Sequence, residues 1–418
     1  MRTSRGDLHF RILEMLQPRQ LAHIGSKLHR LSYSRAFTSP RASLHYFRNY
    51  SSLSDGQLVS GATNKPLPPQ KPLGEWDRAY PVKQAFGTTE RAWLYNDTTA
   101  KKVVDTYGLD DGGEPKTVIE IYPGPGVISR ALLTLPRRVL KKLIILEFSP
   151  GFHPELLALA EADDRVVLMK ESAYYWEVYQ DLQRQGHLDD LARVGFDQVH
   201  PSLRMVGHLP MHILAEQWLS QILRHVADRA WMWQYGRFPI HLLMAERTWA
   251  RVYSQGKLHK SERCKLSVIA QAGCTVKPTL PSAELNPYDH HFFPHSRAVA
   301  EKKRTRLAGN PYVSVGLTPR AEPLITLDNI EHWDFVLRQL FATKGQPLNK
   351  AIGHVAPGAA IILKSVSFDV TTRISDLTVA NWDEVIRAFG AWPFKPDALS
   401  QPSKKDWEAR AEMKETRI

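Results

Sequence analysis

The sequence is poor in cysteine, with Cys264 and Cys274 as its only thiols. Two thiols cannot build a disulfide framework, and alone they cannot complete a tetrahedral zinc site, so we interpret both as structural residues. The chain also lacks any run of eighteen apolar residues, so we predict no transmembrane helix and no membrane partner. Its 418 residues, 43% of them hydrophobic, suffice for two or three domains with a real core.

Acidic residues are scarce at the amino terminus. Residues 1–54 carry eight arginines and one lysine against only Asp7 and Glu14, so more than half of the formal net charge of +12 lies there. Apolar residues between Phe10 and Leu16 can share one face of a helix. An arginine- and serine-rich amphipathic segment is typical of a mitochondrial transit peptide. We therefore predict a transit peptide over 1–54 and a location in the mitochondrial matrix, with a basic nucleic-acid-binding arm as the alternative.

The chain then passes from a linker into a nucleotide-type fold. The proline-rich stretch NKPLPPQKPLG predicts an extended, semi-rigid linker over residues 55–75. TVIEIY (117–122) has the β-branched, apolar character of a buried strand, and the turn Pro123-Gly124-Pro125-Gly126 precedes an apolar helix over 127–135. A strand, a glycine turn and a helix open a doubly wound α/β sheet, in which the backbone approaches a ligand at the helix N-terminus.

Further strand-like segments end in polar residues. LIIL (143–146) ends at Glu147, VVLM (166–169) ends near Ser172, and another strand is expected near residues 203–206. An acid about twenty positions after the glycine turn can accept hydrogen bonds from ribose hydroxyls, and a solvated strand-end carboxylate is the alternative. Because the carboxyl ends of parallel strands meet at one edge of a sheet, we expect one ligand crevice there.

Together these motifs resemble the rRNA adenine N6-dimethyltransferase family, and most closely its fungal mitochondrial transcription factor branch (the mtTFB type). The resemblance runs from about Val82 to Trp392. It implies a Rossmann-like S-adenosylmethionine methyltransferase sheet with helices on both faces over residues 76–322, a small C-terminal helical domain over 323–394 and a flexible tail over 395–418. Seven segments carry it: AWLYNDTTAKKVV (92–104), IEIYPGPGVIS (119–129), LIILEFSPGFHPEL (143–156), LMKESAYYWEVYQDL (168–182), AEQWLSQIL (215–223), WMWQYGRFPIHLLM (231–244) and KSERCKLSVIAQA (260–272).

In the enzymes that the chain resembles, the methyl donor lies over the glycine loop and its ribose meets the strand-end acid. The adenine of the donor normally meets an Asp after the third strand, where this chain has Ser172, or Glu171 if the register shifts by one. S-adenosyl-L-methionine is thus the cofactor implied by the resemblance, and a vestigial donor site is the alternative. The donor positions carried over are Leu94, Asn96, Glu120, Gly124, Gly126, Glu147, Ser172 and His208.

The catalytic motif departs from the family pattern. Active members carry Asn-Leu-Pro-Tyr or a close variant, whose amide holds the target amine and whose ring stacks on a flipped adenine. This chain reads His208-Leu209-Pro210-Met211. Imidazole does not reproduce the amide geometry, and a thioether offers no flat stacking surface. We therefore expect no catalytic residues, and we interpret His208 as a partly buried loop histidine.

Basic and aromatic side chains near the crevice are candidates for nucleic-acid contact. Cations neutralise phosphates without reading sequence, and aromatic rings stack on unpaired bases. The alternatives are solvated charged faces and tryptophans buried in the sheet. No metal is expected, because adjacent histidines such as His290 and His291 point apart on a strand. The nucleic-acid candidates are Lys257, Lys260, Arg263, Lys302, Lys303, Arg304, Arg306, Trp231, Trp233 and Arg237.

The last third of the sequence predicts a sheet closure and then helices. Phe292-Phe293-Pro294 and YVSVGLT (312–318) are expected to pair as the closing hairpin of the sheet. Apolar residues at helical spacing predict a helix from Asp328 onward and shorter helices over 348–352 and 382–389.

The resemblance implies a mitochondrial transcription initiation factor that is not a working enzyme. Such a factor would bind the mitochondrial RNA polymerase and help to melt promoter DNA near the start site. One alternative is a mitochondrial rRNA adenine N6-dimethyltransferase. Another is a ribosome-assembly factor that binds rRNA without modifying it.

Overall fold

The computed structural model describes residues 65–80, 91–211, 213–255, 261–296, 308–397 and 399. The chain divides into two units, residues 1–59 and 60–418, and every described residue belongs to the second. The predicted transit peptide, nearly all of the predicted tail and several basic candidate residues therefore lie outside the described residues. Those candidates are Lys257, Lys260, Lys302, Lys303, Arg304 and Arg306.

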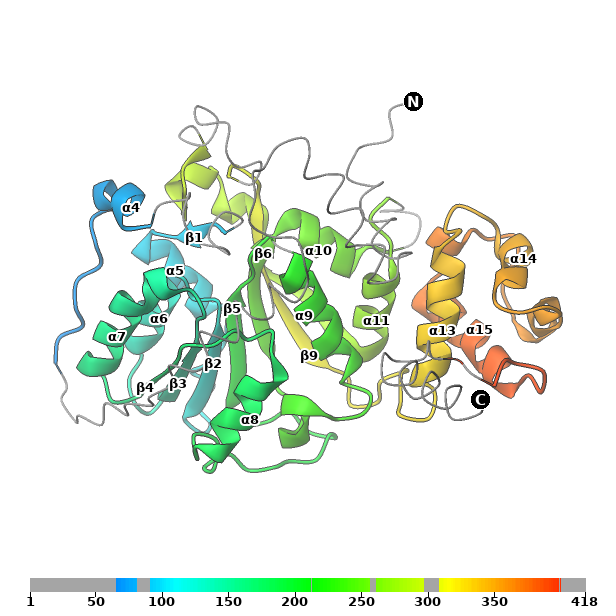
Figure 1. The fold of residues 1–418 in the computed structure, drawn as a ribbon, viewed down its shortest axis with the longest axis horizontal. Helices are drawn as coiled ribbons and strands as arrows, with labels where there is room; N and C mark the ends of the chain where they lie inside the picture. Colours follow the sequence, from blue (N-terminus) through cyan, green and yellow to red (C-terminus); the bar gives the residue numbers. More distant parts are fainter. Residues whose placement is uncertain are drawn as a thin grey trace, which may run out of the picture. The chain divides into compact units, whose positions relative to one another are not determined.

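A seven-stranded sheet in the order β4-β3-β2-β5-β6-β9-β7 forms the centre of the fold (Figure 1). The strands β2 to β6 pair in parallel, and β9 runs antiparallel between β6 and β7. The strand order reverses between β2 and β5, which is the place where open α/β sheets bind ligands. The strands are β2 (Lys116–Ile121), β3 (Leu140–Leu146), β4 (Val166–Met169), β5 (Leu203–His208), β6 (Ile240–Ala245), β7 (Cys274–Leu280) and β9 (Tyr312–Pro319).

Helices cover both faces of this sheet because its strands are apolar on both sides. Val118 points to a core shared with α5, α6 and α7, whereas Ile119 and Ile121 point to a core shared with α8, α9 and α11, as alternation along a strand requires. The helices of this region are α4 (Leu73–Ala79), α5 (Asp97–Asp105), α6 (Val127–Leu133), α7 (His153–Ala162), α8 (Trp176–Arg184), α9 (Ile213–Arg224), α10 (Glu246–Tyr253) and α11 (Lys265–Gly273). Short 3-10 turns join them: η2 (Pro150–Phe152), η3 (Trp231–Tyr235), η5 (Ser282–Leu285) and η6 (Tyr288–His290). The predicted Rossmann-like methyltransferase sheet with helices on both faces is thus confirmed.

The closing hairpin predicted from Phe292 to the segment 312–318 is wrong. Phe292 and Phe293 form β8 (Phe292–Phe293), which pairs antiparallel with β1 (Trp93–Leu94) in a separate two-stranded sheet. The partners of β9 are β6 and β7, and the sequence of β7, CTVKPTL, alternates poorly and contains Pro278. A proline is tolerated there because β7 is the edge strand, and that same proline hides the strand in the sequence.

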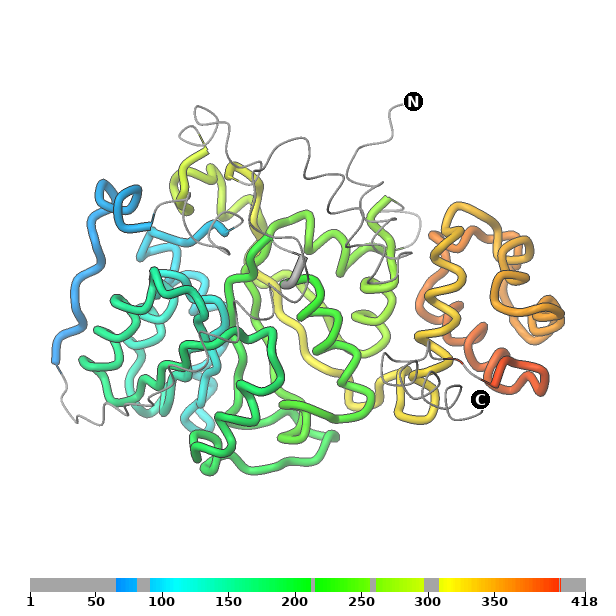
Figure 2. The backbone as a smooth tube through the Cα atoms, viewed as in Figure 1, coloured from blue at the N-terminus to red at the C-terminus, as the bar shows by residue number. Residues whose placement is uncertain are grey.

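The C-terminal helices share one core with the sheet. They are α13 (Ile330–Phe341), α14 (Leu348–Ala351) and α15 (Val379–Ala391), with turns η7 (Ile352–His354), η8 (Ala359–Ser365) and η9 (Ile374–Asp376) (Figure 2). Phe341 and Trp382 stack with their ring centroids 5.2 Å apart, which joins α13 to α15. Asp334 of α13 accepts hydrogen bonds from Arg224 of α9 at 2.7 Å and from Lys265 of α11 at 2.8 Å. The predicted helices are confirmed, and the predicted boundary at residue 323 stays a prediction. No helix among the described residues is both long and apolar enough to cross a membrane.

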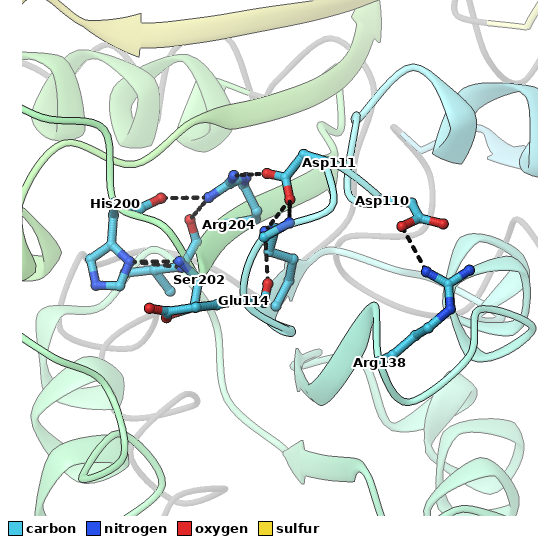
Figure 3. A network of polar contacts seen from close by, with 10 residues as sticks. Asp110, Asp111, Glu114, Arg138, His200, Ser202 and Arg204 are labelled. Atoms are coloured by element: carbon cyan, nitrogen blue, oxygen red, sulfur yellow. Dashed lines mark hydrogen bonds and ion pairs between the residues drawn. The ribbon is translucent and has the colours of Figure 1, made fainter.

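A polar network ties the loops together at the amino ends of β2 and β5 (Figure 3). The Lys116 ammonium donates to Asp111 and to the carbonyl oxygen of Glu114, both at 2.7 Å. Arg204 donates to the carbonyl oxygen of His200 at 2.7 Å and to the other oxygen of Asp111 at 3.4 Å. This network therefore lies at the end of the strands opposite to the carboxyl ends, where a ligand is expected.

Gly207 lets β5 approach β2 closely. A β-carbon at Gly207 would lie 2.3 Å from Cγ1 and 2.9 Å from the carbonyl oxygen of Ile121, its partner in register. We expect Gly207→Ala to lower the free energy of unfolding by about 1–3 kcal/mol, because the backbone of β2 must shift. Urea unfolding measures this change. Gly353→Ala is the control, since nothing lies within 4 Å of that position; equal stability of the two variants would contradict the prediction.

Candidate functional site

The glycine turn follows β2 as predicted, and the residue between them, Tyr122, carries a large side chain. Tyr122, Gly124 and Gly126 all have left-handed φ values, of 54°, 61° and 81°. A tyrosine in this conformation is strained, typically by about 1–2 kcal/mol. The Tyr122 ring is buried, and its hydroxyl lies near the side chain of Ser172, the residue predicted to meet the adenine of a donor. Burial raises the pKa of Tyr122, and the nearby Ser172 side chain opposes that rise.

Glu147, the predicted ribose acceptor, is held by the chain itself. Arg91 donates to both carboxylate oxygens, Nη1 to Oε1 at 2.9 Å and Nη2 to Oε2 at 2.8 Å. The backbone amides of Gly124 and Ser149 donate to the same two oxygens, at 3.1 and 3.0 Å. The side chain of Glu147 is 0% exposed and that of Arg91 is 2% exposed. The carboxylate is therefore neither solvated nor open to a ribose in this structure.

Trp93 lies directly against the glycine turn. A β-carbon on Gly124 would lie 2.3 Å from the Cδ1 atom of Trp93, so only glycine fits beneath the indole. The indole also contacts Phe152, with ring centroids 5.2 Å apart, and stacks on Phe293 at 6.1 Å. Its Nε1 atom is buried and has no hydrogen-bond partner among the described residues.

The remaining donor candidates are also engaged within the protein. Leu94 is buried in β1, and Asn96 caps α5 by accepting a hydrogen bond from the amide of Thr99 at 3.0 Å. Glu120 is buried and accepts a hydrogen bond from the Ser129 hydroxyl at 2.6 Å. Burial raises the pKa of Glu120 to about 8, and the nearby charge of Glu147 adds to that rise.

The degenerate motif begins inside the sheet, not in a loop. His208 is the last residue of β5 and is buried, with its ring edge-on to Tyr312 at a centroid distance of 5.2 Å. Burial lowers the pKa of His208 to about 3, and the charge of Arg91 lowers it further, so the imidazole is neutral. Leu209 is buried, whereas Pro210 and Met211 are half-buried. The interpretation of His208 as a loop histidine is wrong because β5 extends two residues beyond its predicted end.

Three of the predicted nucleic-acid residues form hydrogen bonds within the protein. Trp233 is buried, donates from Nε1 to the carbonyl oxygen of Ile222 at 2.8 Å and stacks on Phe238. Arg237 donates to the carbonyl oxygens of Pro319 and Asp197, each at 2.9 Å. The burial of Trp233 contradicts its predicted role in base stacking, whereas Arg237 is half-buried and its role in phosphate contact stays a prediction.

Arg263 is the third of these residues. It is buried and donates to the carbonyl oxygens of Ser254 and Leu377 and to the Gln271 amide oxygen. The bond to Leu377, at 3.0 Å, links the sheet region to the segment before α15. A guanidinium occupied in this way cannot neutralise a phosphate, so this prediction is wrong too.

The prediction that no metal is bound concerns the whole chain, whereas the structure describes only part of it. Within the described ranges, no group of three or more His, Cys, Asp or Glu residues is arranged to hold a metal ion. Asp289 accepts hydrogen bonds from the amide and hydroxyl of Ser296, and His291 pairs with Thr99.

An aromatic pocket that the sequence reasoning missed lies beside the carboxyl end of β4. Its empty volume of about 200 Å³ includes open solvent, so the aromatic side chains form a shallow hollow at the surface and not an enclosed cavity. Trp231, a predicted candidate, is half-exposed on its wall, and its ring centroid lies 4.5 Å from that of Tyr179. The aromatic run YYWEVY (174–179) is the feature of the sequence that indicates this pocket. The lining residues are Ala173, Tyr174, Trp176, Tyr179, Trp218, Gln221, Ile222 and Trp231.

A strained loop places Trp231 in this wall. Arg229 and Trp231 both have left-handed φ values, of 52° and 60°. Asp228 holds the loop by accepting a hydrogen bond from the amide of Ala230 at 3.0 Å and by pairing with His225 at 2.7 Å. The His225 ring in turn lies 4.5 Å from that of Trp176. Strain of this kind is found at functional sites, where the surroundings fix a side chain in place.

The strand order, the glycine turn after β2 and the acid at the end of β3 define a Rossmann-like S-adenosylmethionine methyltransferase fold. The model of the ribosomal RNA adenine dimethylase family matches residues 85–389, so the chain belongs to that family. The family resemblance predicted from the sequence motifs is thereby confirmed.

Relatives with two different names resemble this chain. Dimethyladenosine transferase 1, mitochondrial, of Vermamoeba vermiformis is 25% identical over 79% of this chain and 97% of its own length. Mitochondrial transcription factor 1 of Saccharomyces cerevisiae is 25% identical over 73% of this chain and 90% of its own length. Among solved structures, a dimethyladenosine transferase from Plasmodium falciparum is 15% identical, with a TM-score of 0.46, over 71% of this chain and 97% of that one.

The raised pKa of Glu120 predicts a specific dependence of stability on pH. The folded state keeps this proton up to about pH 8, whereas an unfolded chain releases it near 4.5, the ordinary pKa of a glutamic acid. The resulting stability is fully present below pH 4.5 and is lost as pH rises through 8, by at most about 1.4 kcal/mol per pH unit. Urea unfolding between these values should show the wild type weakening relative to Glu120→Gln.

The control for Glu120 is an exposed acid on α7. Glu161→Gln should follow the wild type at every pH, because Glu161 is exposed. Parallel pH profiles for the wild type and Glu120→Gln would show that Glu120 is not protonated in the fold.

Proposed function

We propose that this protein is a mitochondrial transcription initiation factor. It binds the mitochondrial RNA polymerase, captures unpaired promoter DNA near the start site and uses the methyltransferase fold as a scaffold without catalysis. The mitochondrial matrix is the proposed location, supported by the basic, acid-poor segment 1–54 and by relatives that are named mitochondrial.

The aromatic pocket is the observation that carries this proposal. Its wall combines Tyr174, Trp176 and Trp231, all half-exposed, with the buried Tyr179 and Trp218. Aromatic faces stack on any base, with about 1–3 kcal/mol for each base. DNA stacking averages about 1.4 kcal/mol per base-pair step, so trapping a few unpaired bases offsets the cost of melting them. The pocket thus supports the stabilisation of an opened strand without the reading of a duplex.

The basic side chains Lys257, Lys260, Lys302, Lys303, Arg304 and Arg306 remain the proposed phosphate contacts. They come from two short stretches of the sequence, and a strand held in an aromatic pocket needs such cations along its backbone. Arg229 is exposed and belongs to the same strained loop as Trp231, so we propose it as a further phosphate contact.

The buried motif supports the absence of methylation. A neutral His208 enclosed by Tyr312 and Phe292 presents no group to a target amine, and Met211 offers no ring for a flipped base. The alternative is a mitochondrial rRNA adenine N6-dimethyltransferase, and it is supported by the relatives that are named mitochondrial dimethyladenosine transferases. A radiolabelled methyl-transfer assay on small-subunit rRNA separates the two, and we expect no incorporation with this protein.

Promoter melting gives a direct test of the proposed role. Run-off transcription by the cognate polymerase should depend on this protein on a linear duplex promoter. On a promoter that is pre-melted around the start site, the dependence should largely vanish, because the melting cost has been removed. An equal requirement on both templates would refute the melting role, and no effect on either would refute the proposed function.

The pocket makes a prediction of its own. Trp176→Ala should weaken binding of a single-stranded oligonucleotide about fivefold to a hundredfold, the loss expected for one stacked base. Fluorescence anisotropy measures the affinity, and Trp176→Phe should retain most of it. Phe394→Ala is the matched control, because Phe394 is 80% exposed and lies outside the pocket. Equal losses in the Ala variants at 176 and 394 would exclude a specific pocket.

A further inference from the structure

The donor crevice of this fold already contains a cation from the same chain. The guanidinium of Arg91 forms a two-point pair with Glu147, with distances of 2.9 and 2.8 Å. Its central carbon lies 5.3 Å from the ring centroid of Phe152 and 5.8 Å from that of Tyr122. A carboxylate opposite the fork and aromatic rings beside the plane are the contacts that a guanidinium prefers.

The same short segment covers the glycine turn. Arg91 and Trp93 are two residues apart next to β1, and side chains at this spacing along an extended chain point to one side. Arg91 therefore pairs with the carboxylate of Glu147, while Trp93 covers the surface of Gly124. Two places that the fold offers to a nucleoside, the acid at the end of β3 and the surface of the glycine turn, are therefore filled by side chains of this protein.

We propose that Arg91 is an internal ligand that has replaced the methyl donor, and that Glu147 with the rings of Tyr122 and Phe152 forms a guanidinium site. The residues present do not fit S-adenosylmethionine, because its ribose needs the carboxylate that Arg91 occupies and its approach to the turn needs the space of Trp93. The crevice thus stabilises the fold and takes no nucleoside. This inference is independent of the proposed nucleic-acid function.

Removing the internal ligand tests the site. In the full chain, Arg91→Ala leaves Glu147 buried without its partner, and we expect the melting temperature to fall by about 10 °C. Methylguanidinium at millimolar concentration should restore most of that loss by entering the vacated position. Methylammonium carries the same charge without the planar fork and should restore far less.

Two controls make the rescue specific. Methylguanidinium should not raise the melting temperature of the wild type, whose site is filled, nor that of Arg91→Ala/Glu147→Gln, which lacks the carboxylate. An unchanged melting temperature in Arg91→Ala, or equal rescue of the single and double variants, would overturn the proposal.

A titration of the wild type keeps the proposal testable even if the variants do not fold. Calorimetry with S-adenosylmethionine should give no saturable heat, and the donor should not shift the melting temperature. Saturable binding would show that Arg91 does not replace the donor. The run-off assay uses no donor, so its outcome and this one are distinguishable.

Discussion

The buried pair of Arg91 and Glu147 is the interaction on which the character of this crevice depends. A carboxylate with no exposed surface is stable only when its charge is matched, and here a guanidinium and two backbone amides match it. The amide of Gly124 is one of these donors, so the pair also sets the shape of the glycine turn. Burial is the main reason why the pKa of His208 is low, and the positive charge of Arg91 lowers it further. The ion pair therefore orders the turn, occupies the proposed ligand position and adds to the cost of protonating His208.

The two proposals assign different regions of the fold to the two activities that an adenine methyltransferase combines, donor binding and base capture. Arg91 and Trp93 occupy the proposed donor side, and the aromatic pocket lies beside β4. The strained loop at Trp231 shows that the pocket wall is held at a cost in backbone energy. The proposed nucleic-acid-binding scaffold without chemistry is consistent with this division.

Sequence patterns predicted the parallel half of the sheet well. The segments at 117–122, 143–146 and 166–169 are strands because uninterrupted β-branched and apolar residues suit a strand buried on both faces. The pattern failed at the antiparallel edge. There β7 contains Pro278 and is half-exposed, so neither continuity nor alternation marks it. The two-residue pairing of β1 with β8 joins segments 200 positions apart, which no local pattern encodes.

By itself, the sequence determined the family, the strand–turn–helix opening and the loss of the amide and ring from the catalytic motif, because these depend on residue types at short spacing. Only the tertiary structure decided which charges meet. Glu147 was expected to hold a ribose and instead holds Arg91, 56 positions away. Arg263 and Trp233 were expected at a surface and instead bond to backbone carbonyls in the interior. Burial and pairing arise from contacts between distant segments, so a residue's type defines what it can do and its neighbours in space decide which of those things it does.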